Sequence, residues 1–389
     1  MKGDSIRVAV IGQGFMGRAH SFAWARAACL ETTALRPVLS VLCARNRDSL
    51  ARHAATYGFA GWSDDWREVV RSPDVDLVDV CTPGASHAEI AAAALHAGKH
   101  VLCEKPLANS LEEAEILTSV AVRAAQQRVF AMVGFNYRRV PALAFAQALI
   151  ATGRLGDVRH VRACYLQDWL VDPSFPLTWR LDGAQAGSGA LGDLGSHVID
   201  LVCFLTGSRF AEVVAQIETF VPERPIAGSE IGLTATAELG GASGPVTVDD
   251  AFTMLGRLDT GALATLEATR MAPGRKNALC IEVNGSAASL RFDLERLNEL
   301  ELCETRGSAG FTRVLVTEPD SPYFAQWWPS GHVLGWEHSF VHEMQDLLAA
   351  IADGRQPEPS FESGLAVQAV LDAVMRSARE HRWVVPGDR

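Results

Sequence analysis

The chain has 389 residues, which predicts two or three domains at about 100 to 200 residues per domain. Hydrophobic residues make up 48% and charged residues 21% of the chain, a composition that excludes a disordered protein. The formal net charge of −11 argues against a nucleic-acid partner, because binding a phosphate backbone needs clustered cations. The eight cysteines are scattered without a Cys-x-x-Cys pair, so we expect buried thiols in a reducing compartment.

Membrane insertion and export are not expected from this sequence. No apolar run approaches the roughly 18 residues that a membrane-spanning helix needs. The N-terminus leads from Met1 to Ser5 directly into a strand pattern and lacks an apolar export segment. We therefore expect a cytoplasmic protein without a membrane partner.

The first third of the chain alternates short apolar strands with helices. We expect strands at 6–11, 38–44, 75–81, 100–103 and 129–135, and helices at 15–29, 48–57, 86–97 and 111–127. This alternation with largely apolar strands predicts a parallel sheet covered by helices on both faces. Residues 1–135 are therefore expected to form a doubly wound Rossmann domain that binds NAD(P).

Beyond residue 135 the pattern changes to successive strands separated by turns. We expect strands at 158–169, 212–220, 246–258, 262–270, 279–283, 288–294, 299–305 and 312–317, and closing helices at 336–352 and 364–380. Strands joined by tight turns pair antiparallel. Residues 136–389 are thus expected to form an α+β domain with a large, mostly antiparallel sheet. The Gly- and Pro-rich segment Pro222–Pro245 is interpreted as a long excursion.

A glycine motif, Gly12-Gln13-Gly14-Phe15-Met16-Gly17, lies between the first strand and the first helix. In a dinucleotide site the first glycine permits a tight turn, the second admits the pyrophosphate and the third allows close packing of helix and strand. The alternative is a glycine turn that binds nothing. The strand context favours cofactor binding, with contacts expected from Gly12, Gly14, Phe15, Met16 and Gly17.

The end of the second strand bears on the choice of cofactor. An acidic residue there holds the adenosine ribose 2′-hydroxyl of NAD, whereas a small residue followed by arginine suits the 2′-phosphate of NADP. The sequence reads Cys43-Ala44-Arg45-Asn46-Arg47, so Ala44 and Arg45 favour NADP over NAD. Two alternatives stay open: the arginines solvate a loop, or Asp48 reaches back to the ribose.

Several ordered motifs carry a resemblance to a known family. They are the glycine motif, Thr82-Pro83 followed by His87, Glu104-Lys105-Pro106 at the end of a strand, and Asp-x-x-x-His at 193–197. With these motifs the whole chain resembles the glucose-fructose oxidoreductase / inositol dehydrogenase (Gfo/Idh/MocA) family. The segments 135–139, 167–169 and 187–193 most resemble the branch that contains levoglucosan dehydrogenase.

The resemblance implies an NAD(P)-dependent dehydrogenase that oxidises a secondary hydroxyl of a sugar, anhydrosugar, glycoside or cyclitol. It implies cofactor contacts from Thr82, Pro83, His87, Glu104 and Lys105. It also implies a cis peptide bond before Pro106, and Lys105 hydrogen-bonded to the reacting hydroxyl. His197 is implied as general base, and the division of acid-base work between Lys105 and His197 stays open.

Spacing supports the same assignment for Asp193 and His197. Residues four apart share one face of a helix, one turn apart. A neutral histidine with a pKa of about 6.5 accepts a proton near neutral pH, and Asp193 can orient the imidazole or accept from a substrate hydroxyl. Three alternatives stay open: His197 as a core histidine, the pair as part of a metal site without a clear third ligand, and His87 as a helix start rather than a nicotinamide neighbour.

A sugar pocket combines aromatic rings, which pack on ring CH groups, with polar side chains that bind hydroxyls. Residues of this kind that match the branch are Tyr137, Gln167, Trp169, Trp179 and Arg180, together with Asp193 and His197. Taken singly, each aromatic residue also suits a core position. No metal is expected.

The sequence departs from the family pattern at Gly84, where an asparagine commonly follows Thr-Pro, and at Ala44. A second function is a catalytically silent dinucleotide-binding regulatory protein of the same fold, which the intact set of Lys105, Asp193 and His197 disfavours. A broad sheet face in the second domain needs covering, so we expect a homodimer or homotetramer.

Overall fold

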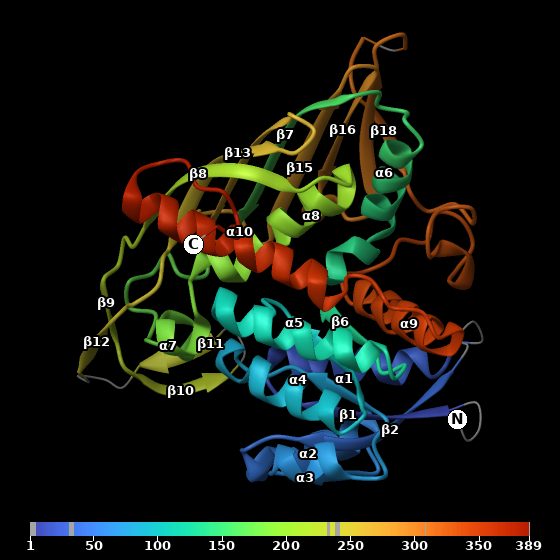
Figure 1. The fold of residues 1–389 in the computed structure, drawn as a ribbon, viewed down its shortest axis with the longest axis vertical. Coiled ribbons are helices and arrows are strands. Elements are labelled where there is room, and N and C mark those ends of the chain that lie inside the picture. The colour runs from blue at the N-terminus through green and yellow to red at the C-terminus, as the bar shows by residue number, and fades with distance from the viewer. Residues whose placement is uncertain (1–4, 31–34, 232–233, 238–241, 308, 389) are drawn as a thin grey trace. The chain divides into compact units, whose positions relative to one another are not determined.

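The computed structural model describes residues 5–30, 35–231, 234–237, 242–307 and 309–388. Contacts within the chain divide it into two compact units. Unit 1 consists of residues 1–136, 231–234 and 337–365, and unit 2 of residues 137–230, 235–336 and 366–389. Each unit is built around its own sheet (Figure 1).

Unit 1 contains a six-stranded sheet in the order β3-β2-β1-β4-β5-β6, in which every neighbouring pair is parallel. The strands are β1 (Ser5–Ile11), β2 (Arg36–Cys43), β3 (Gly61–Ser63), β4 (Leu77–Val80), β5 (His100–Glu104) and β6 (Ala131–Gly134). The order reverses between β1 and β4, and in open parallel sheets ligands bind at such a switch point, beyond the carboxyl ends of the strands. The predicted Rossmann fold is confirmed. The three-residue β3 and the six-residue helix at Trp66–Arg71 were missed, because both are too short to show periodicity.

The helices of unit 1 fall into two contacting groups, as right-handed crossovers on the two sides of a switch point require. One group is α1 (Phe15–Ala27), α2 (Arg47–Tyr57) and α9 (His338–Asp353), and the other is α3 (Trp66–Arg71), α4 (His87–His96) and α5 (Leu111–Ala125). Local capping fixes several starts. Asn46 caps α2, and Ser110 with Glu113 forms a capping box on α5.

Unit 2 contains an eight-stranded sheet in the order β18-β17-β16-β15-β7-β14-β13-β8. Its strands are β7 (Val158–Leu166), β8 (Phe210–Glu218), β13 (Ala251–Leu258), β14 (Leu263–Thr269), β15 (Ala278–Gly285), β16 (Ala288–Asp293), β17 (Glu299–Glu304) and β18 (Thr312–Leu315). Only β7 and β14 pair in parallel. The predicted large, mostly antiparallel sheet is confirmed.

Helices α6 (Pro141–Ala151) and α8 (Ser196–Thr206) pack together within unit 2, and α8 also contacts β7. Along β13 and β14 alternate side chains are buried, as expected for a sheet with one covered face. On the other face Leu255 and Leu263 remain 52% and 49% exposed. Helix α10 (Phe361–Glu380) contributes Ser377, whose hydroxyl accepts a hydrogen bond from the Ala215 N–H at 3.0 Å.

The segment expected to be a long excursion contains short strands instead. These are β9 (Glu223–Pro225), β10 (Ala227–Ile231), β11 (Thr234–Ala237) and β12 (Ser243–Pro245), while residues 232–233 and 238–241 lie outside the described part of the chain. Strands of three to five residues show no readable periodicity. Arg224 is fully buried here and donates to the carbonyl oxygens of Leu170 and Asp172 at 2.7 and 2.8 Å.

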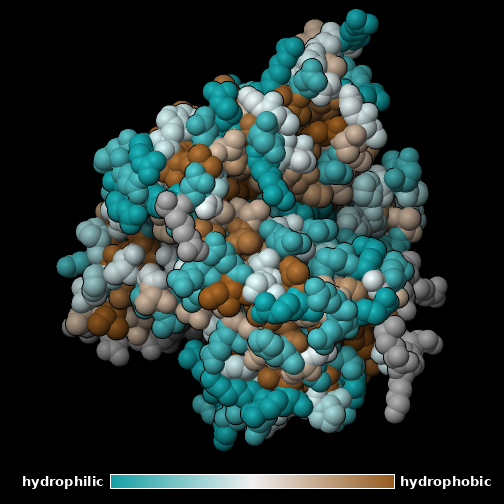
Figure 2. All heavy atoms as spheres, viewed as in Figure 1, coloured by the Kyte–Doolittle hydropathy of each residue, from teal (hydrophilic) through white to brown (hydrophobic). Residues whose placement is uncertain are grey.

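One helical stretch, Gly183–Thr206, is long and apolar enough to span a membrane by length and composition. In the structure, 78% of its most apolar window is buried within the protein, as is typical of a core helix. On the face drawn in Figure 2, hydrophilic residues surround small, separate groups of apolar ones. The stretch also carries Asp193 and His197, so its burial bears directly on the candidate site.

Candidate active site

The glycine motif of unit 1 forms the tight turn between β1 and α1. Gly12 has φ +122°, and its N–H donates to the Cys43 carbonyl at 2.8 Å. A Cβ at Gly12 would lie 2.4 Å from the Cys81 carbonyl oxygen, and one at Gly17 would lie 2.0 Å from the Gly12 carbonyl oxygen. Both positions therefore exclude any side chain.

The open side of this turn is at Gly14, which is exposed and where an added Cβ would meet nothing within 4 Å. Gly14 is the N-cap of α1 and makes no side-chain cap, and Phe15 and Met16 follow in the first turn, both half-buried. The first N–H groups of an α-helix have no intrahelical acceptor, so this end suits an anion. The residues present fit the pyrophosphate of a dinucleotide.

The residues after β2 lie in a loop that separates the two arginines. Arg47 forms an ion pair with Asp64, with its Nε 2.6 Å from Oδ2, whereas Arg45 is exposed and Ala44 is half-buried. The backbone N–H of Asp48 donates to the Asn46 side chain, which caps α2. Of the two arginines, Arg45 is therefore the better placed to meet a ribose phosphate.

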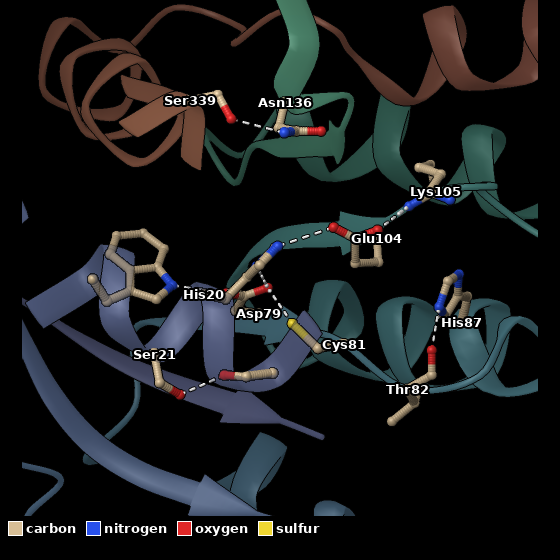
Figure 3. Close-up of polar contacts among 12 residues, drawn as sticks. His20, Ser21, Asp79, Cys81, Thr82, His87, Glu104, Lys105, Asn136 and Ser339 are labelled. Carbon is tan, nitrogen blue, oxygen red and sulfur yellow. Dashed lines mark hydrogen bonds and ion pairs between the residues drawn. The ribbon is translucent and has the colours of Figure 1, made fainter. Parts of the chain in front are cut away.

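His87 links two loops of unit 1 and begins helix α4. Its ring is 1% exposed, and Nε2 lies 2.8 Å from the Thr82 carbonyl oxygen (Figure 3). On the other side of the ring, Nδ1 lies 2.9 Å from the Pro106 carbonyl oxygen. Burial lowers the pKa of His87 below its usual value. The side chain thus holds the loop after β4, including Pro83, against the loop after β5.

Gly84, where the sequence departs from the family pattern, lies next to the side chain of Asn109. Gly84 is buried and begins the short turn η1 (Gly84–Ser86). A Cβ at this position would lie 2.3 Å from Oδ1 of Asn109. A side chain at residue 84 would therefore displace the Asn109 side chain.

Glu104-Lys105-Pro106 ends β5 at the carboxyl edge of the parallel sheet. The peptide bond between Lys105 and Pro106 is cis, as the family resemblance implied. Glu104 is 4% exposed, and its Oε2 accepts the Lys105 backbone N–H at 3.2 Å. Its Oε1 lies 2.9 Å from Nε2 of His20, a residue that the sequence analysis missed.

In unit 2, Asp193 and His197 lie on one continuous helical stretch but not on one regular α-helix. Asp193 belongs to a π-helical turn, η4 (Leu191–Gly195), and His197 belongs to α8, which follows directly. A π-turn changes the direction of its side chains relative to an α-helix and is frequent at functional sites. The prediction of a regular α-helix face is therefore corrected at Asp193.

The start of the π-turn is fixed by Asp249, which is 6% exposed. Its two carboxylate oxygens accept the N–H groups of Gly189 and Leu191, each at 2.7 Å. At the other end, a Cβ on Gly195 would lie 2.6 Å from the Phe252 ring. Both contacts join residues distant in sequence, so no local signal predicts the π-turn.

His197 is 6% exposed and packs against two tyrosines. Its ring centroid lies 4.7 Å from that of Tyr137 and 5.9 Å from that of Tyr165. The two phenol oxygens are 2.8 Å apart, and Tyr165 donates to Oδ1 of Asn277 at 2.7 Å. Burial raises the pKa of Tyr165 well above its usual value, so this hydroxyl stays protonated.

The hydrogen-bonded chain continues to Gln167 and Trp169. Gln167 donates to the same Asn277 oxygen at 2.7 Å and accepts from Trp169 Nε1 at 2.8 Å. The buried guanidinium of Arg270 lies 5.5 Å from the Trp169 ring centroid, and its Nη1 is 3.9 Å from Oδ2 of Asp193. The structure thus joins Tyr137, Gln167, Trp169, Asp193 and His197 into one cluster.

Trp179 and Arg180 lie on a separate short turn, η3 (Trp179–Leu181), where the guanidinium is 4.4 Å from the indole centroid. Their neighbour Leu181 packs in the same apolar cluster as Trp169. The described contacts do not join Trp179 to the hydrogen-bonded chain above.

Sequence reasoning missed Tyr165, Asn277 and Arg270 in this cluster. Strand alternation contained a signal for Tyr165, because residues two apart share a face and Gln167 was already a candidate. Asn277 and Arg270 carried no comparable signal, since each comes from a strand or turn more than 100 residues along the chain from Gln167.

Comparisons with known proteins identify the family of the chain. Residues 6–135 match the model described as "Oxidoreductase family, NAD-binding Rossmann fold", and residues 143–291 match the "GFO/IDH/MocA C-terminal domain". Levoglucosan dehydrogenase of Pseudarthrobacter phenanthrenivorans is 40% identical over 387 residues, covering 98% of each chain.

Solved structures give the same result. An oxidoreductase domain protein from Kribbella flavida is 51% identical, with a TM-score of 0.94 over 99% of this chain and 100% of that one. A levoglucosan dehydrogenase in complex with NADH and levoglucosan is 38% identical, with a TM-score of 0.91 over 99% of this chain and 100% of that one. The chain therefore belongs to the Gfo/Idh/MocA family of oxidoreductases and has its NAD-binding Rossmann fold and C-terminal domain.

Proposed function

We propose that this protein is an NAD(P)-dependent dehydrogenase that oxidises a secondary hydroxyl of a sugar, anhydrosugar, glycoside or cyclitol. The observation that carries the proposal is the intact set of Lys105, Asp193 and His197, with Lys105 at the carboxyl edge of the dinucleotide-binding sheet. The related levoglucosan dehydrogenase and an inositol 2-dehydrogenase act on substrates of this class, as their names state.

Oxidation of a secondary alcohol removes a hydride from carbon and a proton from oxygen. The nicotinamide, when bound, supplies the hydride acceptor. His197 accepts the hydroxyl proton as general base, and the Lys105 ammonium donates a hydrogen bond to the same oxygen, which favours its deprotonation. Asp193 orients the imidazole or accepts from a neighbouring hydroxyl. The products are a ketone, the reduced nicotinamide and a proton.

Cofactor contacts are assigned to unit 1 and substrate contacts to unit 2. We assign the pyrophosphate to the turn at 12–17, and the nicotinamide end to Thr82, Pro83, His87, Glu104 and Lys105. The sugar is assigned to Tyr137, Gln167, Trp169, Trp179, Arg180, Asp193 and His197. Residues 1–135 are proposed as the cofactor domain and 136–389 as the substrate and oligomerisation domain.

Within this proposal the cofactor choice favours NADP, because Ala44 leaves room and Arg45 offers a guanidinium for the 2′-phosphate. The complexes of the related levoglucosan dehydrogenase contain NADH, which makes the choice worth measuring. Arg45→Ala is expected to raise the KM for NADP about tenfold and to leave the KM for NAD unchanged. Tighter binding of NAD than NADP by the unaltered protein would contradict the preference.

The exposed sheet face with Leu255 and Leu263 supports a homodimer or homotetramer as a further part of the proposal. A cytoplasmic location fits an enzyme that draws on the cellular pool of nicotinamide cofactors. Sedimentation of the purified protein measures the oligomeric state directly.

The test of function is a panel of sugars, anhydrosugars and cyclitols with both cofactors, followed by the absorbance of the reduced nicotinamide. With a competent substrate, Lys105→Ala and His197→Ala are each expected to lower kcat about 100- to 10,000-fold. Lys99→Ala is the matched control, because Lys99 lies before β5 and donates to the carbonyl oxygens of Ser72 and Val75.

Full activity of either site variant would remove that residue from the mechanism. Tight binding of a dinucleotide without turnover of any panel member would instead favour the catalytically silent regulatory protein.

A further inference from the structure

Unit 1 contains a charged cluster next to the end of β5, and its central histidine has no role in the proposed mechanism. Its central residue, His20 on α1, is 0% exposed and lies between two buried carboxylates. Nδ1 is 2.9 Å from Oδ2 of Asp79 on β4, and Nε2 is 2.9 Å from Oε1 of Glu104 on β5 (Figure 3). One imidazole therefore connects a helix to two neighbouring strands.

The surrounding groups complete the cluster. Trp24, one turn further along α1, donates from Nε1 to Oδ2 of Asp79 at 2.7 Å, and Phe340 packs on the His20 ring at 5.3 Å between centroids. Gly134 on β6 leaves room for Glu104, since a Cβ there would lie 3.0 Å from Oε1. The cluster is thus enclosed on the sides of α1, α9 and β6.

The chemistry of the imidazole follows from its two partners. Each ring nitrogen faces a carboxylate oxygen, so with both carboxylates ionised both nitrogens donate and the ring is an imidazolium. Burial alone would lower the pKa of His20, but the Asp79 carboxylate raises it well above the usual value. Removal of this cation would leave two buried carboxylates without their shared partner, which is strongly unfavourable.

The same side chains place potential metal ligands close together. The ligand atoms of His20, Asp79 and Cys81 lie within 4.8 Å of one another. An imidazolium that donates from both nitrogens has no lone pair for a metal ion. The hydrogen bonds of the cluster therefore account for its composition.

Glu104 connects this cluster to the residue that follows it. One carboxylate oxygen contacts His20, and the other accepts the backbone N–H of Lys105 at 3.2 Å. Because His20 fixes one oxygen of this carboxylate, the other oxygen fixes the backbone N–H of Lys105. The Lys105 side chain starts from this backbone. The distance from His20 to the backbone of Lys105 is spanned by a single side chain.

We propose that His20 is a positioning residue for catalysis, which fixes the Lys105 backbone by clamping the Glu104 carboxylate. This inference rests on the proposed role of Lys105. It predicts that His20 affects the rate of the chemical step through Lys105 and not through dinucleotide binding.

The experiment is a double-mutant cycle on the full-length protein with a competent substrate. His20→Gln is expected to lower kcat about 10- to 100-fold, with the KM for the dinucleotide changed less than about twofold. In a Lys105→Ala background the same substitution is expected to lower kcat less than about threefold, because the residue through which His20 acts is gone.

Trp24→Phe is the matched control, since it removes a hydrogen bond to Asp79 and leaves the contact between His20 and Glu104 in place. It is expected to retain kcat within about threefold while it lowers the melting temperature. Glu104→Gln is the second variant, used where His20→Gln does not fold. It is expected to lower kcat in the same way and to lose most of that effect in the Lys105→Ala background.

Three results would overturn the inference: unchanged kcat in both His20→Gln and Glu104→Gln, an equal loss in Trp24→Phe, or losses that add fully to that of Lys105→Ala. Full activity of Lys105→Ala itself would instead overturn the proposed function, so the two failures are distinguishable.

Discussion

The two units hold their candidate functional groups in different ways. In unit 1 the backbone dominates: a glycine turn with φ +122° at Gly12, strand ends at one sheet edge and a cis peptide before Pro106. In unit 2 side chains dominate, through a hydrogen-bonded chain from Tyr137 to Trp169 and the Asp249 contacts with the π-turn.

Because of this difference, the two units tolerate amino-acid substitutions to different degrees. Where a glycine turn has no space for a Cβ, no other residue can replace the glycine. Such a rigid turn suits a cofactor of constant shape. A network of hydroxyl, amide and indole groups changes its donors one substitution at a time, which suits substrates of varied shape. We therefore expect variants of the glycine turn in unit 1 to act through dinucleotide binding, and variants of the hydrogen-bonded network in unit 2 to act on sugar turnover.

The largest effect is expected for Gly12→Ala. The new Cβ would overlap the Cys81 carbonyl at a positive φ, so dinucleotide affinity should fall more than about 100-fold, with a loss of stability of several kcal/mol. Tryptophan fluorescence titration and thermal unfolding measure the two quantities. The control is Gly58→Ala, with φ +83° and open space, which should cost about 1 kcal/mol and leave binding unchanged. Equal losses of dinucleotide affinity in Gly12→Ala and Gly58→Ala would contradict the role of the glycine turn in binding.

Next in size is Asp249→Asn. An amide keeps only one acceptor oxygen for the N–H groups of Gly189 and Leu191, so the π-turn loses one of its two anchors. We expect kcat for the sugar to fall about 100-fold with the KM for the dinucleotide unchanged, measured by steady-state kinetics. Asp182→Asn, at the N-cap of α7 (Gly183–Ala186), is the control and should keep kcat. A raised KM for the dinucleotide in Asp249→Asn would contradict the separation of roles.

A smaller effect is expected for Tyr165→Phe. The change removes the hydroxyl that bonds Tyr137 and Asn277, and leaves the ring against His197. The KM for the sugar should rise about tenfold, and the free energy of unfolding should fall by about 1 to 2 kcal/mol. Tyr57→Phe in unit 1 is the matched control and should match the unaltered protein in sugar kinetics. An unchanged KM for Tyr165→Phe would place the phenol network outside the substrate pocket.

The remaining effects are observed only when the pH changes, and they arise from histidines of unit 1. Burial lowers the pKa of His100 to about 4, and its Nδ1 accepts the Phe130 N–H at 3.0 Å. Because the unfolded chain binds the proton first, at a pKa of about 6.5, stability should fall as the pH drops from there toward 4, by about 2 kcal/mol. Urea unfolding of His100→Gln and of the unaltered protein at several pH values measures the contribution of His100 to stability. The same pH dependence in both proteins would contradict the prediction.

His20 is expected to act with the opposite sign. Its pKa is raised in the folded protein, so its contribution is complete below the unfolded value of about 6.5 and is lost as the pH rises through the folded value. The stability difference between the unaltered protein and His20→Gln should therefore shrink toward alkaline pH. A difference that grows with pH would contradict the imidazolium assignment.

The fold class, most strand positions and the residues of local motifs could be predicted from the amino-acid order alone. Gly12, Gly14 and Gly17 were readable because a tight turn between strand and helix restricts its own residues. The same holds for Lys105 beside Pro106 at a strand end, and for the change from helix-separated to turn-separated strands near residue 135. These features depend on neighbours along the chain, whose chemistry the sequence lists directly.

The contacts between buried polar groups, in contrast, could be identified only in the folded chain. His20 with Glu104, Tyr165 with Asn277 and Asp249 with the start of the π-turn each join residues at least 58 positions apart. No periodicity or turn rule connects such residues, because their pairing is enforced by the cost of leaving a buried donor or charge without a partner. That cost exists only once the sheets and helices have packed.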